Sequence, residues 1–303
     1  MSEETRTDLR QADAFVTVEG VLSEKKLEEV TGSDGKRTIK GSVSIKVGDT
    51  NFITLNVWVN EFTSKGDVNN AFAGMKTVMN EYQSIAEVGE EAATRVFCKR
   101  GQLQPNSYVG KEDLMVHTGV RYSVSYLTRV APDKFSPRAE FGVEGFINTI
   151  LEEMDKEGQP TGRLKMGLYV PTYRGVEPLE VIVPEETASD FDSNFDRGQT
   201  TKIYGDILNC SIVKEKEIKL VVGGVRKEKS TSWINELRAT GAEAAYDDGR
   251  EYDSEAIQKG LVERELRLKK EAEEAAEAKK KGTTSQAAAT GRTLPKFSGF
   301  ANM

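Results

Sequence analysis

The sequence predicts a mainly β protein, with two small five-stranded barrels in tandem, a charged helix after them and a flexible C-terminal tail. Three observations support this fold class. Apolar and polar residues alternate with a period of two in several segments between residues 14 and 223, as they do in half-buried strands. One helical segment interrupts the strands in each half. Short sequence features of the first half also recur about 125 residues later.

The first unit reads as three strands, a helix and two strands. Between the third and fourth strands, Gly66 to Ile85 has apolar residues three and four positions apart, which is typical of a helix that buries one face. This order is the one expected of an OB-like Greek-key barrel, whose second and third strands carry the ligand face. The expected strands are 14–22, 37–47, 52–60, 94–103 and 119–130.

The third expected strand places large aromatic residues on its polar face. Every odd position between Ile53 and Val59 is aliphatic, so this set faces the core, because side chains alternate along a strand. Phe52 and Trp58 then share the other face with threonine and asparagine. Stacking on the bases of single-stranded nucleic acid is one reason for such an arrangement. Burial under a loop, a helix or a second domain is the alternative.

The second expected strand adds positive charge to the same face. Ile39, Val43, Ile45 and Val47 form its inward set, whereas Lys40 and Lys46 point outward. Residues 48–51 favour a tight turn between the two strands. Antiparallel pairing then places Lys40 and Lys46 beside Phe52 and Trp58, which predicts a stacking platform with phosphate-binding cations next to it.

A proline-containing linker at 131–137 precedes a second unit with a similar pattern. Val143-Glu144-Gly145 repeats Val18-Glu19-Gly20 at a distance of 125 residues. The following strand has Leu164, Met166, Leu168 and Val170 inward, and its expected outward residues are Arg163, Lys165 and Tyr169. A turn around Tyr173 and Arg174 leads to 179–183, a short acidic helix fills 184–198, and strands at 201–213 and 217–222 close the barrel.

The C-terminal part has a different composition. Trp233 to Leu237 reads as a short helix docked on the second barrel. Ser254 to Lys281 is rich in good helix formers without a heptad pattern, which predicts a solvated helix. The domain boundaries that follow are a flexible N-terminus at 1–13, barrels at 14–131 and 139–224, a charged helical segment at 225–281 and a disordered tail at 282–303.

Composition and motifs argue against an enzyme. The chain has 303 residues, one histidine and two cysteines, so we expect no Cys/His metal site and no cofactor. Glycine-rich phosphate-binding motifs are absent from the sequence. No apolar run approaches the roughly 18 residues of a membrane span. Few cysteines and a polar N-terminus predict a cytoplasmic protein, in the host cytoplasm if the source is viral.

These features together resemble single-stranded DNA-binding proteins of the OB-fold type, and among them the tandem-barrel kind found in bacteriophages. Lys40, Lys46, Phe52 and Trp58 carry the resemblance in the first unit, and Arg163, Lys165 and Tyr169 carry it in the second. The resemblance implies binding of single-stranded DNA during replication, recombination or repair. It also implies a C-terminal peptide for replication or recombination proteins, here with Phe297 and Phe300, although Arg292 and Lys296 replace the acidic run usual in such tails.

Further candidates for nucleic-acid binding lie outside the two platforms. They are Arg95, Phe97, Lys99, Arg121, Tyr173 and Arg174. The orientation of Tyr122 and Tyr126 stays open at this point. The main alternative function is a β-rich structural or assembly protein, such as a virion component, in which Phe52 and Trp58 lie in a protein interface. The net charge of −7 fits a nucleic-acid binder only if the basic residues gather on one face.

Overall fold

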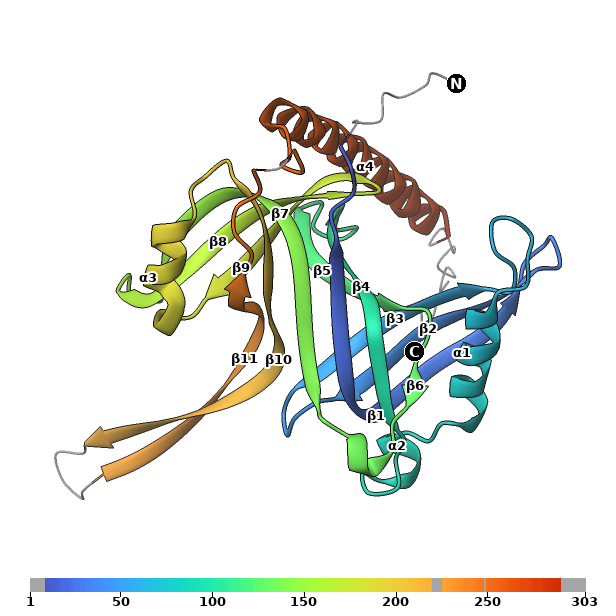
Figure 1. Ribbon diagram of the computed structural model, residues 1–303. Helices are drawn as coiled ribbons and strands as arrows, with labels where there is room; N and C mark the ends of the chain where they lie inside the picture. The colour runs from blue at the N-terminus through green and yellow to red at the C-terminus, as the bar shows by residue number, and fades with distance from the viewer. Residues whose placement is uncertain (1–8, 220–224, 248, 290–303) are drawn as a thin grey trace, which may run out of the picture.

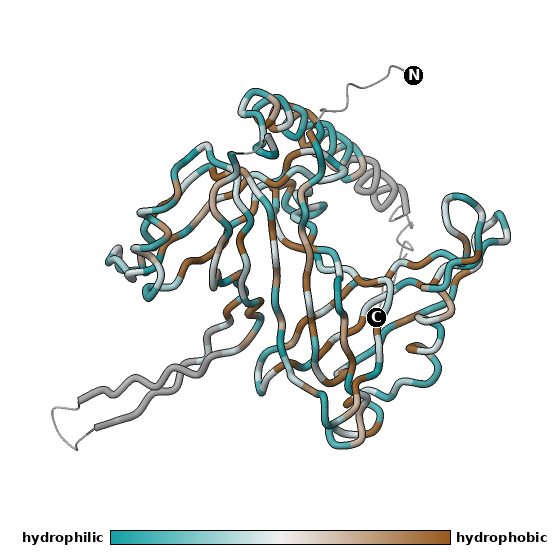
Figure 2. Tube along the Cα trace, in the orientation of Figure 1, coloured by the Kyte–Doolittle hydropathy of each residue, from teal (hydrophilic) through white to brown (hydrophobic). Residues whose placement is uncertain are grey.

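The computed structural model describes residues 9–219, 225–247 and 249–289. Its strands form two closed barrels that lie side by side, with a long helix across one end of both (Figure 1). Short apolar and polar stretches alternate along the strands of both barrels, whereas the long helix is mostly hydrophilic (Figure 2). No helix in these residues is long and apolar enough to cross a membrane.

The first barrel has the strand order of an OB-fold. β1 pairs with β2 and β2 with β3, β3 pairs in parallel with β5, and β4 closes the barrel between β5 and β1. The helix α1 lies between β3 and β4 in sequence, as expected. The elements are β1 (Ala14–Thr31), β2 (Arg37–Lys46), β3 (Phe52–Asn60), α1 (Asn70–Glu81), α2 (Ile85–Val88), β4 (Arg95–Val109), β5 (Val116–Val124) and β6 (Thr128–Arg129).

Local sequence signals explain the first barrel well. The predicted inward residues of β2 and β3, from Ile39 to Val59, are buried, with only Val47 half-buried beyond the end of β2. The Asn69 side chain caps α1 by accepting a hydrogen bond from the Ala71 amide at 3.1 Å. Phe72 and Met75 on α1 pack against the barrel. The helix therefore forms where its apolar spacing predicts.

The second barrel repeats the same pairing. β7, β8 and β9 are joined in order, β9 pairs in parallel with β11, and β10 closes the barrel between β11 and β7. This confirms the tandem barrels that the sequence predicts. The elements are the 3-10 helix η1 (Pro132–Lys134), β7 (Arg138–Met154), β8 (Pro160–Thr172), β9 (Gly175–Val183), α3 (Glu185–Asn194), β10 (Thr200–Lys219), β11 (Val225–Ala242) and α4 (Ser254–Ala289).

Four expectations about the chain's organisation are wrong. Over the described residues, the predicted strands at 201–213 and 217–222 are joined in one strand, β10, so the barrel's fifth strand comes later, in β11. Trp233 to Leu237 is therefore part of β11 and not a helix. The helix α4 continues past Gly282 to Ala289. Residues 9–13 are anchored, because the Ala12 amide donates to the Pro171 carbonyl at 2.9 Å.

The two barrels are joined by their first strands. β1 and β7 pair antiparallel over six residue pairs, from Ala14 with Val143 to Glu19 with Arg138. Val16 pairs with Phe141, which is 125 residues further on. The register is symmetric about this one pair of equivalent positions, so the junction has a local two-fold relation. The weak sequence echo at 125 residues reflects this duplication.

The repeated glutamates of the two Val-Glu-Gly segments hold this junction together. Glu19 is 4% exposed, accepts a hydrogen bond from the Ser136 amide at 2.9 Å and pairs with Arg138 at 3.3 Å. Glu144 is 3% exposed, accepts from the Asp13 amide at 3.0 Å and pairs with Arg10. Each glutamate therefore binds the segment that leads into the other barrel. Although burial alone would raise it, the bonds from Arg10 and Asp13 hold the pKa of Glu144 below its usual value.

The helix α4 connects the barrels at one end. Arg267 binds the carboxylate of Glu177 on β9 at 2.5 Å, and Arg264 lies 3.3 Å from the same carboxylate. Arg264 also donates to the Ser107 hydroxyl on β4 at 2.8 Å. Glu177 is 1% exposed, and these arginines offset the cost of burying its carboxylate. Contrary to the expectation of a fully solvated helix, α4 packs against both barrels and buries Ile257 and Leu268.

Candidate nucleic-acid interface

The outer face of β2 and β3 carries the predicted aromatic and basic residues. Lys40 lies directly opposite Trp58, and Lys46 lies opposite Phe52. Trp58 is 67% exposed. Phe52, at the turn end of the face, is less exposed and half-buried. Phe52 and Trp58 are six residues apart, about 20 Å along the strand. Their face is open and long enough to hold several nucleotides.

Both lysines on this face already contact carboxylates. The Lys40 ammonium lies 3.1 Å from Glu28, and the Lys46 ammonium lies 2.6 Å from Glu90. Lys46 is the less exposed of the two. A phosphate arriving on this face would have to replace a carboxylate at either position. The lysines are therefore weaker cationic sites than the sequence pattern alone indicates.

The polar face extends from β2 and β3 across β5 and β4. Asn56 lies opposite Ser42 on one side and beside Ser123 on the other, and Ser123 lies opposite Gln102. These four side chains form one row across four strands, because cross-strand partners share a face. In the next row Arg121 lies opposite Gln104. The face therefore offers hydrogen-bond donors and acceptors beside Trp58.

Arg121 is an uncommitted cation on this face. Its side chain is exposed, and it forms no ion pair with the residues that the structure describes. It lines two neighbouring hollows of the surface, one with Trp58 and one with residues of the second barrel. A guanidinium at this point can bind a phosphate without first releasing a carboxylate.

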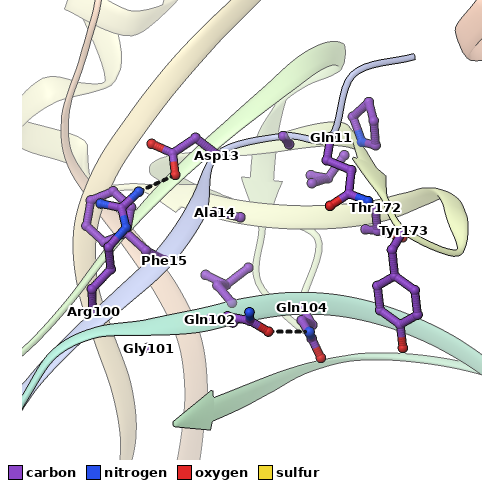
Figure 3. A pocket seen from close by; sticks show the side chains of 14 residues that line it. Gln11, Asp13, Ala14, Phe15, Arg100, Gly101, Gln102, Gln104, Thr172 and Tyr173 are labelled. Carbon is purple, nitrogen blue, oxygen red and sulfur yellow. Dashed lines mark hydrogen bonds and ion pairs between the residues drawn. The ribbon is translucent and has the colours of Figure 1, made fainter. Parts of the chain in front are cut away.

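Three adjoining hollows form a cleft between the barrels, which we name the inter-barrel cleft. The first, of about 640 Å³, lies between Trp58, Arg121 and Tyr173. The second shares Arg121 with it and reaches the second barrel at Glu180 and Asn209. The third shares Gln102, Gln104 and Tyr173 with the first (Figure 3). The shared residues make the hollows one continuous surface.

Tyr173 brings the second barrel to this cleft. It lies in the turn between β8 and β9, is 53% exposed and projects toward the strands that carry Gln104 (Figure 3). The Arg174 guanidinium lies over the Tyr173 ring, 5.4 Å from its centre. Thus the structure places the predicted residue Tyr173 of the second unit in the same cleft as Trp58.

The third hollow contains a cluster of charges at the end away from Tyr173 (Figure 3). Asp13 accepts hydrogen bonds from Arg100 at 2.5 Å and from Lys202 at 2.7 Å. Although burial alone would raise it, these bonds hold the pKa of Asp13 below its usual value. Arg100 also stacks over Phe15, 4.3 Å from the ring centre. The arginine is therefore held at the edge of the cleft (Figure 3).

The predicted platform on β8 is not equivalent to that of the first barrel. Arg163 pairs with Glu236 at 2.6 Å and lies 3.1 Å from Glu153, which is also 3.9 Å from Lys165. Tyr169 packs against the apolar cluster around Tyr252. All three side chains leave the barrel interior as the alternation predicts, but the structure does not bring them to the inter-barrel cleft.

The predicted residues of β4 divide into two groups. The Arg95 guanidinium lies over Phe135 of the inter-barrel linker at 5.4 Å, and Phe97 lies under Arg138, the first residue of β7, at 5.3 Å. Lys99 is exposed beside a smaller hollow that it shares with Gln102 and Ser123. Phe97 lines the same hollow, so Phe97 and Lys99 both border the polar face.

The structure settles the orientation of the two tyrosines near β5, but it does not describe the phenylalanines of the tail. Tyr122 lies inward beside Val124, and burial raises the pKa of its hydroxyl. Tyr126 lies outward and is 54% exposed. Phe297 and Phe300, the predicted partner-binding residues, lie outside the described residues.

Sequence reasoning missed two kinds of site residue. Gln102, Gln104 and Ser123 become visible as a site only when β5 is inserted between β3 and β4, which is a long-range pairing. Trp233, 65% exposed on β11, was assigned to a helix. Its surroundings, Thr231 to Asn235, are rich in strand-forming residues, and that signal could have placed it on a strand.

No cluster of histidine, cysteine, aspartate or glutamate suited to a metal ion occurs among the described residues. His117 contacts Asp113 at 2.7 Å and stacks on Tyr108 at the β4–β5 turn. Cys98 is buried, which raises the pKa of its thiol to about 11, so it is a poor nucleophile.

The fold and the cleft define a tandem OB-barrel protein with a polar and aromatic groove between its barrels. Residues 14–277 match the model of the YorF family, and the chain belongs to that family. A comparison with curated proteins found no match.

Among solved structures, the chain is similar to the wild-type single-stranded DNA-binding protein from Thermus aquaticus, with a TM-score of 0.46 and 11% identity. That match covers 78% of this chain and 95% of that chain. A deletion mutant of the same Thermus aquaticus protein is similar with a TM-score of 0.45 and 12% identity, covering 81% and 98% of the two chains.

Proposed function

We propose that this protein binds single-stranded DNA in the inter-barrel cleft, with little preference for sequence. The observation that carries the proposal is the exposed ring of Trp58 beside Lys40, in one hollow with Arg121 and Tyr173. Exposed aromatic rings next to a cation on an OB barrel suit a strand whose bases are free to stack. An ordinary solvated sheet face has no need of either feature.

Stacking supplies affinity that does not depend on base identity. Each base on an aromatic ring contributes about 1–3 kcal/mol, because every base has a π face. Trp58 and Tyr173 are exposed rings that line the cleft, and Phe52 is a half-buried ring on the same face as Trp58. In duplex DNA the bases are already stacked and paired, so the same rings cannot bind them. We therefore expect a strong preference for single strands.

Electrostatics has a smaller role than the sequence pattern predicts. Arg121 can take a phosphate directly, whereas Lys40 and Lys46 must exchange Glu28 and Glu90 for it. Binding of phosphate by a cation releases counterions, so affinity falls as salt rises. With few uncommitted cations in the cleft, we expect a shallow salt dependence for a protein of this class.

The cellular role follows from this activity as part of the proposal. A protein that coats single strands without sequence preference protects them during replication, recombination or repair. The expected setting is the cytoplasm, in a host cell if the protein is of the bacteriophage type. Residues 282–303 would then present Phe297 and Phe300 to replication or recombination proteins.

The test is a titration of fluorescently labelled oligo-dT with the full chain, followed by anisotropy. A duplex of equal length and a salt series are run in parallel. The proposal expects binding to oligo-dT at low salt and much weaker binding to the duplex. Absence of oligo-dT binding at low salt would overturn it. It would favour the alternative of a structural or assembly protein, in which the Trp58 face contacts another protein.

The double variant Trp58→Ala with Phe52→Ala separates the two functions further. The proposal expects loss of oligo-dT affinity with an unchanged urea unfolding midpoint. Loss of folding would instead show that these rings belong to the core.

A further inference from the structure

Trp233 stands on the β10–β11 hairpin, which projects from the second barrel (Figure 1). It lies opposite Ser211, and the neighbouring pair on the same face is Asn209 with Asn235. Asn209 and Asn235 both line the inter-barrel cleft beside Arg121. Side chains two residues apart on a strand share a face, so Trp233 lies about 7 Å beyond the cleft wall on the same face.

A hydrogen-bond network fixes this tryptophan relative to the first barrel. The Trp233 indole N–H donates to the Asn209 side-chain oxygen at 2.9 Å. The Asn209 side-chain amide donates to the Phe52 carbonyl at 3.0 Å, and its backbone amide donates to the Asn51 side chain at 2.9 Å. Asn51 in turn donates to the Ile207 carbonyl at 3.0 Å. The base of the hairpin is therefore attached to the β2–β3 turn.

The network leaves the ring itself open. Trp233 is 65% exposed although its only polar atom already has a partner. An aromatic ring that is held in place loses little side-chain entropy when a ligand stacks on it. The sequence has two tryptophans, and both are more than 60% exposed next to the inter-barrel cleft.

We infer that Trp233 is a second base-stacking position, which extends the DNA path from the inter-barrel cleft onto the β10–β11 hairpin. This inference rests on the proposed function and adds a residue of the second barrel to it. A strand that stacks on Trp58 and passes Arg121 reaches Asn209 at the far wall of the cleft, with Trp233 next in line. The Asn51–Asn209 network positions Trp233 for this contact.

The two tryptophans allow a direct test in the full chain. In the Trp58→Phe variant all tryptophan emission comes from Trp233, and in the Trp233→Phe variant all of it comes from Trp58. Each variant is titrated with oligo-dT of about 30 nucleotides, the upper range for two OB barrels, while anisotropy of the labelled DNA records binding independently. The inference expects quenching in both variants.

The outcomes separate the two proposals. Binding of oligo-dT with unchanged Trp233 emission would overturn the inference and leave the proposed function intact. Absence of binding in both variants and in the parent protein would overturn the proposed function. A Trp233 emission that changes with protein concentration without DNA would show that the ring docks on a second copy, and would also overturn the inference.

Affinity measurements give a second readout. Trp233→Ala is expected to weaken binding of the long oligo-dT roughly 5- to 150-fold, the equivalent of one lost stack. Trp233→Phe keeps a ring and should restore most of this loss. An oligo-dT of about 8 nucleotides, short enough for one barrel, should bind Trp233→Ala as tightly as the parent protein. Equal affinity of parent and Trp233→Ala for the long oligo-dT would count against the inference.

Discussion

Trp58 combines two properties that are rarely found together in a side chain of a sheet. It is large and apolar, yet two-thirds of it is exposed, and its cross-strand partner is the lysine Lys40. The inward side chains on either side of it, Val57 and Val59, are buried. The ring therefore contributes little to folding and is available for a ligand.

Replacement of Trp58 by alanine should separate binding from stability. We expect oligo-dT affinity to fall by about 1–3 kcal/mol, the value of one base stack. The free energy of unfolding in urea should change by less than about 0.5 kcal/mol, as for exposed substitutions in general. Trp58→Phe is the matched control and should retain most of the affinity. A large loss of stability with unchanged DNA affinity would contradict this assignment.

Arg121 is predicted to act through its charge. Arg121→Ala should weaken oligo-dT binding and reduce the slope of log affinity against log salt by about 0.7, the value for one phosphate contact on a single strand. The exposed Lys269 on α4 lies outside the inter-barrel cleft, so Lys269→Ala is the control with the same change in charge. An equal change of slope in both variants would indicate a general effect of net charge instead.

At the scale of single residues, the sequence predicts well which face of a strand each side chain takes. It predicts poorly which charged groups form ion pairs. A period of two determines which face a side chain takes, and the turn at residues 48–51 sets the register that pairs Lys40 with Trp58. Which cations are neutralised depends on Glu28 and Glu90, which come from other parts of the chain. That information is not present in the local pattern.

Among the elements, α4 has a structural role that its composition does not reveal. It contacts Ser107 on one barrel and Glu177 on the other through two arginines. Its sequence reads as a solvated helix because these contacts use charged side chains together with only a few apolar ones, such as Ile257 and Leu268. The sequence also fails to predict the hairpin of β10 and β11. Its strands continue beyond the barrel with polar residues, so they lack the apolar alternation of a half-buried strand.

The double variant Arg264→Ala with Arg267→Ala should destabilise the protein. Glu177 is 1% exposed, and the double variant removes both arginines that form ion pairs with its carboxylate. Removal of the partners of a buried charge costs about 3–5 kcal/mol. Urea unfolding measures the loss, and adding Glu177→Gln to the double variant should recover part of it. An unchanged unfolding midpoint in the double variant would mean that α4 does not support the barrels.

The junction glutamate Glu144 should make stability depend on acid pH. Its folded-state pKa lies below the ordinary value of 4.5, so its contribution is present at neutral pH and is lost as pH falls below that value. Glu144→Gln should therefore lower the free energy of unfolding at pH 7 by about 1.5–3 kcal/mol, the value of hydrogen bonds to a charged group.

The difference between Glu144→Gln and the parent should shrink as pH falls below about 4. Urea unfolding at several pH values measures it. Glu157→Gln, in the exposed β7–β8 turn, serves as the control and should show little effect at any pH. A loss that stays constant down to low pH would contradict the role of the Glu144 charge.

The whole molecule is two copies of one barrel joined through their first strands. Each barrel was predictable because its strands alternate and its helix has the expected place in the order. The junction between the barrels was not predictable, because the pairing of β1 with β7 depends on residues more than 100 positions apart. Only the repeated Val-Glu-Gly segments hinted at it, through glutamates that each bind the segment leading into the other barrel.

This junction explains why the two barrels do not present equivalent faces. It brings the β8–β9 turn and the base of the β10–β11 hairpin to the outer face of the first barrel. The face of the second barrel that carries Tyr169 is instead covered by residues around Tyr252 and the start of α4. The account therefore predicts one path for DNA, between the barrels, and not two parallel platforms.

Photocrosslinking of oligo-dT to the full chain at low salt, with mass spectrometry of the linked peptides, tests this central claim most directly. Irradiation joins thymine to aromatic side chains in contact with it. The account predicts crosslinks at Trp58 and Tyr173, with none in a duplex of equal length. Absence of crosslinks to oligo-dT, or crosslinks confined to Tyr169 and its neighbours on β8, would contradict it.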